Sequence, residues 1–151
     1  MKKQLQYTRI NQQLQNLLSA TPYQITQLAN ASALLAQSLE DINWSGFYLM
    51  EEGKLILGPF QGKVACMEIK IGSGVCGTAV ARDEIMLVKD VHQFPGHIAC
   101  DSASNSEIVL PIHKNGHIIG VLDIDSPILA RFDETDREGL SEFVRILEEK
   151  L

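Results

Sequence analysis

The sequence lacks the long apolar segments that mark membrane or exported proteins. No apolar run approaches the ~20 residues that a spanning helix needs. The first fifteen residues, MKKQLQYTRINQQLQ, carry two lysines but no apolar stretch behind them, so we expect no signal peptide. We therefore expect a cytoplasmic protein, a setting in which disulfides are usually transient or catalytic.

Positive charge is also scarce. Thirteen Lys and Arg residues oppose nineteen Asp and Glu residues, which gives a net charge of −6. This balance argues against nucleic acid or an anionic membrane as the main partner. With 45% hydrophobic and 21% charged residues over 151 positions, the chain suits one soluble globular domain.

Cysteine is rare, and its spacing is uninformative. Cys66, Cys76 and Cys100 match no CxxC, zinc or haem pattern. They are either three inert small hydrophobic residues or a nucleophile with resolving partners. The glycine stretch GSGVCG is too loose for a dinucleotide-binding fingerprint, since no strand–GxGxxG–helix unit is present.

The hydrophobic pattern predicts helices toward both ends of the chain and hairpins between them. A single domain would comprise N-terminal helices in residues 1–39, a sheet with active-site loops in 43–127 and a C-terminal helix at 133–150. The expected elements are helices at 3–18 and 22–39, strands at 43–50 and 54–60, a short helical patch within 72–83, a strand at 84–91, an irregular segment at 92–106, and a hairpin at 107–126.

Consecutive hairpins favour an antiparallel sheet and an α+β fold. The last hairpin is apolar on both faces, so we expect it to be central and covered on both sides. One face would carry Ile108, Leu110, Leu122 and Ile124, and the other Val109, Ile119 and Val121. Helices would cover one face of the sheet, and loops above a ligand pocket would cover the other.

Cys100 lies within a loop of small and polar residues, GHIACDSASNS, where a thiol is accessible. A cysteine nucleophile needs groups that manage protons nearby. His97 precedes it and Glu107 opens the next strand. His97 also fits a solvated loop histidine, and Asp101 also fits a residue that closes a turn through its own side chain.

Asp123 and Asp125 lie two apart in one strand and therefore share a face. Adjacent carboxylates are unfavourable unless they share a proton, bind a cation or hold a positively charged ligand. Asp125 can be explained by the turn into Ser126-Pro127, but Asp123 cannot. Acids without clustered histidines match only a weak oxygen-ligand metal site, and we expect no metal.

Trp44 and Tyr48 share another strand face, with Gly46 between them. A small residue flanked by two aromatic rings predicts a slot suited to a methyl group, a sulfur atom or an ammonium. The alternative is a pair of aromatic residues packed in the core.

The sequence blocks together resemble the free methionine-(R)-sulfoxide reductases, which are stand-alone GAF-domain enzymes. The resemblance runs from about Asn43 to the C-terminus, includes all three cysteines, and departs at Val64, where relatives often have proline. The blocks that carry it are NWSGFYL, LGPFQGKVAC, GSGVCGTA, DVHQFPGHIACD, SEIVLPI and GVLDIDS.

The resemblance implies a role for each thiol. Cys100 corresponds to the nucleophile, Cys66 to the main resolving cysteine and Cys76 to a second one. Thioredoxin would be the external reductant, with no bound cofactor. The cysteine would become a sulfenic acid, which a second thiol converts to a disulfide.

The resemblance also implies the substrate contacts. Glu107, Asp123 and Asp125 would hold the polar end and the sulfoxide of free methionine (R)-sulfoxide, and Trp44 and Tyr48 would surround its methyl group.

The competing interpretations are a GAF sensor or binding module without catalysis, and a dimerisation domain. The sequence leaves the choice between monomer and homodimer open.

The last hairpin must have one particular register if Glu107 is to join the two aspartates. A two-residue Asn115-Gly116 turn would pair Lys114 with His117 and so Glu107 with Ile124, which would point Glu107 to the wrong face. We therefore predict a three-residue or other odd loop, with Gly116 at positive φ and Glu107 opposite Asp123.

Overall fold

The computed structural model describes residues 2–97 and 103–151. Its centre is a six-stranded sheet in the order β3-β2-β1-β6-β5-β4, and all neighbouring strands are antiparallel. This confirms the α+β prediction. The strands are β1 (Trp44–Glu51), β2 (Lys54–Gly62), β3 (Glu68–Lys70), β4 (Met86–Val88), β5 (Ser106–Lys114) and β6 (His117–Ser126).

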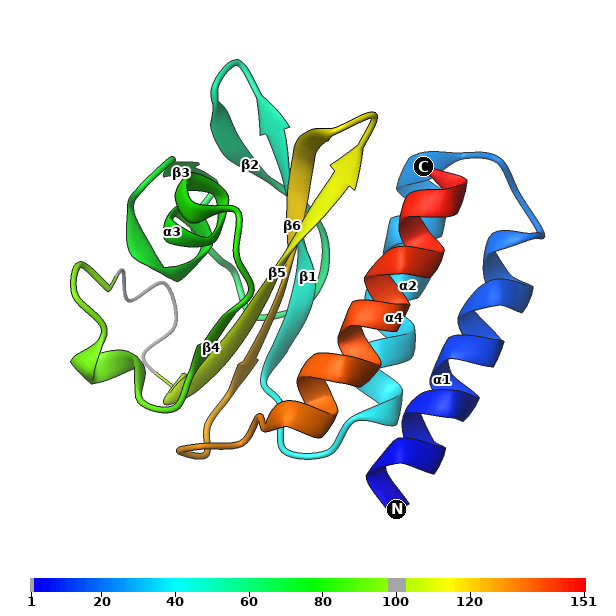
Figure 1. Cartoon of the computed structure of the whole chain (residues 1–151), viewed down its shortest axis with the longest axis horizontal. Helices are drawn as coiled ribbons and strands as arrows, with labels where there is room; N and C mark the ends of the chain where they lie inside the picture. The colour runs from blue at the N-terminus through cyan, green and yellow to red at the C-terminus, as the bar shows by residue number, and fades with distance from the viewer. Residues whose placement is uncertain (1, 98–102) are drawn as a thin grey trace.

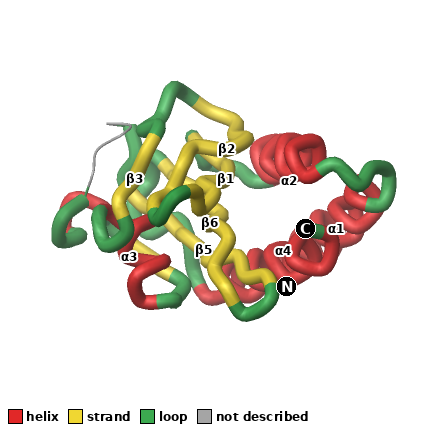
Figure 2. The backbone as a smooth tube through the Cα atoms, turned by 90° about the horizontal axis from the view of Figure 1, so that it is seen from above, coloured by secondary structure: helices red, strands yellow, loops and turns green. Residues whose placement is uncertain are grey.

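Helices cover one face of the sheet, as predicted. Helices α2 (Gln24–Ser38) and α4 (Glu134–Lys150) pack against the strands, and α1 (Lys2–Leu18) packs on both of them away from the sheet (Figure 1). The opposite face carries α3 (Gly74–Arg82), the short 3₁₀ helix η1 (Val91–Gln93) and loops, as Figure 2 shows from above. No helix within the described part of the chain is long and apolar enough to cross a membrane.

Each face of the sheet is covered by its own cluster of apolar side chains. The larger one joins the three long helices to the side chains of Phe47, Ile108, Leu110, Leu122 and Ile124. The smaller one joins α3 to the other face, through residues that include Val109 and Val121. The central hairpin is therefore buried on both sides because its strands are apolar at nearly every position.

Local signals set most element ends, but several bounds differ from the prediction, and strand β3 was not predicted. Asp133 caps α4 in a capping box with Asp136, which fixes the start of that helix. Helix α2 begins at Gln24, two residues later than predicted, because Tyr23 is its N-cap in an extended conformation. Strand β4 contains three residues of the predicted 84–91, because only Met86–Val88 pair with β5.

The β5–β6 turn differs from the prediction. Lys114 pairs with His117 across a two-residue turn, in which Asn115 (φ 53°) and Gly116 (φ 80°) both have positive φ. The odd loop was therefore wrong, although the positive φ of Gly116 was right. Such a two-residue turn matches the twist of the flanking strands.

In a regular ladder, this turn would point Glu107 to the opposite face of the sheet from Asp123 and Asp125. A β-bulge in β6 cancels that effect. His113 pairs with Ile118, but Ile112 pairs with Gly120, so Ile119 is an extra residue in β6. Ile119 consequently packs against the helix-side cluster, and its predicted assignment to the other face was wrong.

Beyond the bulge, Glu107 pairs with Asp125 rather than with the predicted Asp123. Asp125 and Asp123 occupy alternate positions of β6, and paired residues share a face. All three carboxylates therefore lie on the α3 side of the sheet, as the three-carboxylate prediction requires.

Candidate active site

Two neighbouring rows of paired residues form the floor of the site. In the first row Trp44 of β1 pairs with Asp125 of β6, which pairs with Glu107 of β5. In the second row Gly46 of β1 pairs with Asp123 of β6. The central strands therefore bring the aromatic and acidic residues, which are far apart in sequence, onto one surface.

A pocket lies above this floor, on the side of the sheet that the long helices leave uncovered. Its walls come from the start of α3, from the segment before β3 and from the side of His97 and Ser104. The lining residues are Trp44, Tyr48, Val64, Ala65, Ile69, Ser73, Gly74, Val75, Cys76, His97, Ser104, Glu107, Asp123 and Asp125.

Glu107 is held as a buried carboxyl group among other acids. Its exposed fraction is 7%. Burial raises its pKa well above the ordinary value, and the charges of Asp123 and Asp125 raise it further. Among the described residues, no Lys, Arg or His forms an ion pair with Glu107 or Asp123. These surroundings favour the protonated, neutral form of Glu107.

Asp123 is equally buried, at 5% exposed. Burial raises its pKa, while hydrogen bonds from Glu107, Asp125 and Cys76 oppose that shift. Its Oδ1 atom is buried and has no hydrogen-bond partner among the described residues. Asp123 therefore brings an acceptor into the pocket that the surrounding protein groups do not satisfy.

Cys76 projects from α3 onto the acids. Its Sγ donates toward Glu107 Oε2 across 4.0 Å, and its side chain is buried. Burial raises the pKa of this thiol well above its usual value, and the nearby carboxylates raise it further. The surroundings therefore keep Cys76 as a neutral thiol.

The aromatic residues form one wall rather than the predicted slot. The rings of Trp44 and Tyr48 stack at 5.8 Å between centroids, and Phe60 stacks on Trp44 at 5.1 Å. A Cβ on Gly46 would lie 2.2 Å from the Phe60 Cβ, so the side chain of Phe60 fills the space above the glycine. Trp44 and Tyr48 both line the pocket, but the space above the glycine between them is filled.

The wall is tied to the loop that carries Cys66. Trp44 Nε1 donates to the Lys63 carbonyl oxygen at 3.2 Å, and Tyr48 Oη donates to the Cys66 carbonyl oxygen at 2.9 Å. Burial raises the pKa of Tyr48, which keeps its hydroxyl protonated for this bond. The same strand that lines the pocket thus positions the backbone of Cys66.

The two cysteines that the structure describes differ in state. Cys66 is disulfide-bonded, whereas Cys76 is a free buried thiol. Cys100 and Asp101 lie outside the described residues, so the predicted pairing of Cys66 with Cys100 stays a prediction.

Two further loop residues contribute to the pocket. His97 lines it, and burial together with neighbouring His92 lowers its pKa, which favours the neutral imidazole. Ser104, which the sequence reading missed, is buried and accepts a hydrogen bond from Asn43 Nδ2 at 3.1 Å. A lone serine in a polar loop carries no sequence signal that would have identified it.

The antiparallel sheet, with long helices on one face and a pocket under loops on the other, defines the class of protein. The family model described as GAF domain matches residues 10–151, which agrees with this architecture. GAF domains share this fold whether they bind ligands or catalyse reactions, so the class alone leaves the activity open.

Proteins with higher sequence identity indicate which family of GAF-domain proteins the chain belongs to. The chain is 54% identical to the free methionine-R-sulfoxide reductase of Escherichia coli over 96% of this chain and 88% of that protein. It also resembles the Staphylococcus aureus fRMsr in complex with substrate (54% identity, TM-score 0.92, 96% and 95% covered). The substrate complex of the Neisseria meningitidis free methionine-R-sulfoxide reductase is similar too (43%, TM-score 0.93, 95% and 87%). The chain belongs to the free methionine-R-sulfoxide reductase family of enzymes.

Proposed function

We propose that this enzyme reduces free methionine (R)-sulfoxide to methionine by thiol chemistry in the pocket above β1, β5 and β6. The observation that carries the proposal is the buried acid cluster, with a raised Glu107 pKa, beside the aromatic wall. A sulfoxide is a poor electrophile until its oxygen is protonated or strongly hydrogen-bonded. A carboxyl group kept neutral by its surroundings is suited to donate that proton.

Cys100 is the proposed nucleophile. Its thiolate attacks the substrate sulfur and forms a sulfur–sulfur bond while Glu107 donates a proton to the oxygen. The resulting hydroxyl group moves from the substrate sulfur to the Cys100 sulfur, and the sulfur–sulfur bond breaks with its electron pair going to methionine. Methionine leaves, and Cys100 carries the hydroxyl group as a sulfenic acid. The thiol of Cys66 then attacks the sulfenic sulfur, which releases water and forms a disulfide. Two thiols of thioredoxin reduce this disulfide and restore both cysteines, so no bound cofactor is needed.

Cys66 is the better candidate for the resolving thiol. It is already disulfide-bonded in the structure. Cys76 is buried beside carboxylates that disfavour its thiolate, and the thiolate is the form that attacks sulfur. We therefore assign Cys76, which the resemblance marks as a second resolving cysteine, a minor part in resolution.

Substrate choice follows from the charges and shape of the pocket. The free ammonium of methionine sulfoxide offers a partner for the carboxylates that remain ionised. When the oxygen faces Glu107 and Asp123, the methyl group of the R epimer lies against Trp44. The S epimer exchanges these groups and buries a polar oxygen against the indole ring, which is unfavourable.

A coupled assay tests this proposal and separates it from the sensor alternative. Purified enzyme, thioredoxin, thioredoxin reductase and NADPH are mixed with the R epimer, the S epimer or a peptide containing methionine sulfoxide. NADPH consumption is expected only with the free R epimer and should disappear in Cys100→Ser. Binding without NADPH consumption would support a sensor, and equal rates on both epimers would refute the pocket assignment.

A further inference from the structure

The side chain of Cys76 changes the chemistry of the acid cluster. Three side chains from different elements meet here: Cys76 from α3, Glu107 from β5 and Asp123 from β6. Each offers one possible ligand atom, and these three atoms lie within 4.8 Å of one another. All three residues are buried, and all three line the same pocket. The cluster thus combines one sulfur and two oxygen ligands that are already gathered at one point.

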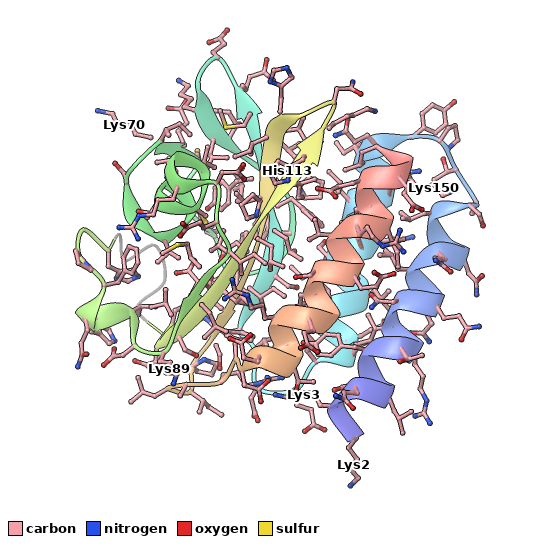
Figure 3. The ribbon with its side chains drawn as sticks, in the orientation of Figure 1. Lys2, Lys3, Lys70, Lys89, His113 and Lys150 are labelled. Atoms are coloured by element: carbon pink, nitrogen blue, oxygen red, sulfur yellow. The ribbon has the colours of Figure 1, made fainter. Side chains whose placement is uncertain are left out.

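An independent observation indicates that this cluster is suited to a further partner. The Oδ1 atom of Asp123 is buried and accepts no hydrogen bond from the described residues. A buried carboxylate oxygen without a donor is unfavourable unless a ligand satisfies it. No lysine or arginine of the described ranges pairs with it. In Figure 3 the labelled Lys70 extends outward from β3.

The spacing is close to that of a tetrahedral metal site. Zinc binds cysteine sulfur at about 2.3 Å and carboxylate oxygen at about 2.0–2.2 Å, which places neighbouring ligand atoms roughly 3.3–3.7 Å apart. Cys76 Sγ and Glu107 Oε2 are 4.0 Å apart. Small side-chain rotations would close this distance, and the fourth position would face the pocket.

The ligand types select the metal. Carboxylates alone suit hard cations such as magnesium or calcium. A thiolate beside two carboxylates favours a borderline or soft cation instead. The ion would also replace the proton of the thiol and lessen the repulsion between the acids.

We propose that the pocket binds one thiophilic divalent cation, Zn²⁺ or Cd²⁺, through Cys76, Glu107 and Asp123, and that the bound cation excludes the substrate. Binding exchanges the thiol proton, and any proton on Glu107, for the metal, with no change of oxidation state. The exclusion of substrate rests on the proposed function, because Glu107 and Asp123 cannot hold metal and sulfoxide together. The metal binding does not rest on it.

A cadmium titration tests the binding. The oxidised wild-type protein, in which Cys66 is disulfide-bonded and Cys76 is free, is freed of metal with a chelator and titrated with Cd²⁺. One equivalent should produce the ultraviolet thiolate-to-cadmium charge-transfer band and release protons. Cys76→Ala should abolish the band. Glu107→Gln and Asp123→Asn should weaken binding by more than the roughly 10–100-fold that loss of an outer-shell partner costs.

Controls separate this site from adventitious binding. His113 forms an exposed cluster with Asp83 and Glu148, and His113→Ala should leave the cadmium band unchanged. Cys76→Ser replaces Cys76→Ala if the smaller side chain unfolds the protein, because a hydroxyl also gives no thiolate band. A missing band in the wild type, or a band that persists without the Cys76 thiol, would overturn the site.

Competition is measured in the Cys66→Ser/Cys100→Ser double variant, in which Cys76 is the one remaining cysteine. Methionine (R)-sulfoxide should raise the apparent Cd²⁺ dissociation constant in proportion to its concentration. An unchanged constant would overturn the exclusion of substrate. This result does not depend on turnover, so failure of the NADPH assay and failure of metal binding are distinguishable.

Discussion

Glu107→Gln separates the proton-donor role of Glu107 from its cost to stability. The substitution keeps the shape of a side chain that is 7% exposed and removes its transferable proton. Loss of a general acid lowers the rate ~10²–10⁴-fold. At 1.36 kcal/mol for each factor of ten, this loss equals about 2.7–5.4 kcal/mol of transition-state stabilisation.

The same substitution should stabilise the folded protein at neutral pH. The folded-state pKa of Glu107 is raised above the unfolded value, which is about 4.3. Between these two pKa values the native state holds a proton that the unfolded chain has released, so wild-type stability falls as pH rises. Glutamine carries no such proton, and its advantage should grow from pH 4 upward and vanish below the unfolded pKa.

Two measurements check these expectations. Reduced enzyme is mixed with one equivalent of methionine (R)-sulfoxide without thioredoxin, and methionine is quantified over time as a single turnover. Urea unfolding at pH 4 and pH 8 gives the stability difference. Glu68→Gln is a matched control, because Glu68 is an exposed residue of β3 that pairs with Lys54. We expect its rate to be unchanged and its stability to move by less than about 0.5 kcal/mol. A Glu107→Gln rate within about threefold of the wild type would contradict the general-acid role.

Other expectations test the register of β5 and β6, the roles of the cysteines and the aromatic wall of the pocket. Deleting Ile119 should keep the pairing of Glu107 and single-turnover activity, because β6 then forms a regular ladder. The deletion should lower the free energy of unfolding by about 1 kcal/mol through lost packing and lower Tm by about 2–4 °C. An inactive variant would contradict the claim that the bulge sets the register of Glu107. Cys100→Ser should form no methionine in single-turnover assays, and any stoichiometric product would refute its role. Peptide mapping of oxidised protein should show Cys66 linked to Cys100; a Cys76 linkage would reverse the assignment. Trp44→Ala should lower the R-over-S preference, measured with separated epimers.

The fold was largely predictable because local patterns agree with it. Helical periodicity, the Asp133 cap and turn residues between apolar runs define elements without reference to distant contacts. Two-sided apolar strands likewise require cover on both faces. The pattern failed at β4, where 84–91 are apolar enough for a strand but only three residues find a partner.

Several residues that line the pocket were also named from the sequence, but their geometry was not. Asp123 within an apolar strand is anomalous enough to signal function without a structure. The prediction of a slot above Gly46 was wrong because the pattern of one strand does not reveal which residue of the neighbouring strand pairs with the glycine. Phe60, from β2, fills that space.

The sequence by itself determined that Asp123 and Asp125 share a face, because residues two apart in a strand point to the same side, while the family resemblance implied that Glu107 joins them. Only the tertiary structure decided how they reach it. In a hairpin that is apolar on both faces, hydrophobicity does not distinguish two registers one residue apart. The Asn115-Gly116 turn favours one register, and the bulge at Ile119 restores the other by packing that side chain against the helices. The position of Cys76 over the acids likewise depends on how α3 packs on the sheet, which the order of residues along the chain does not specify.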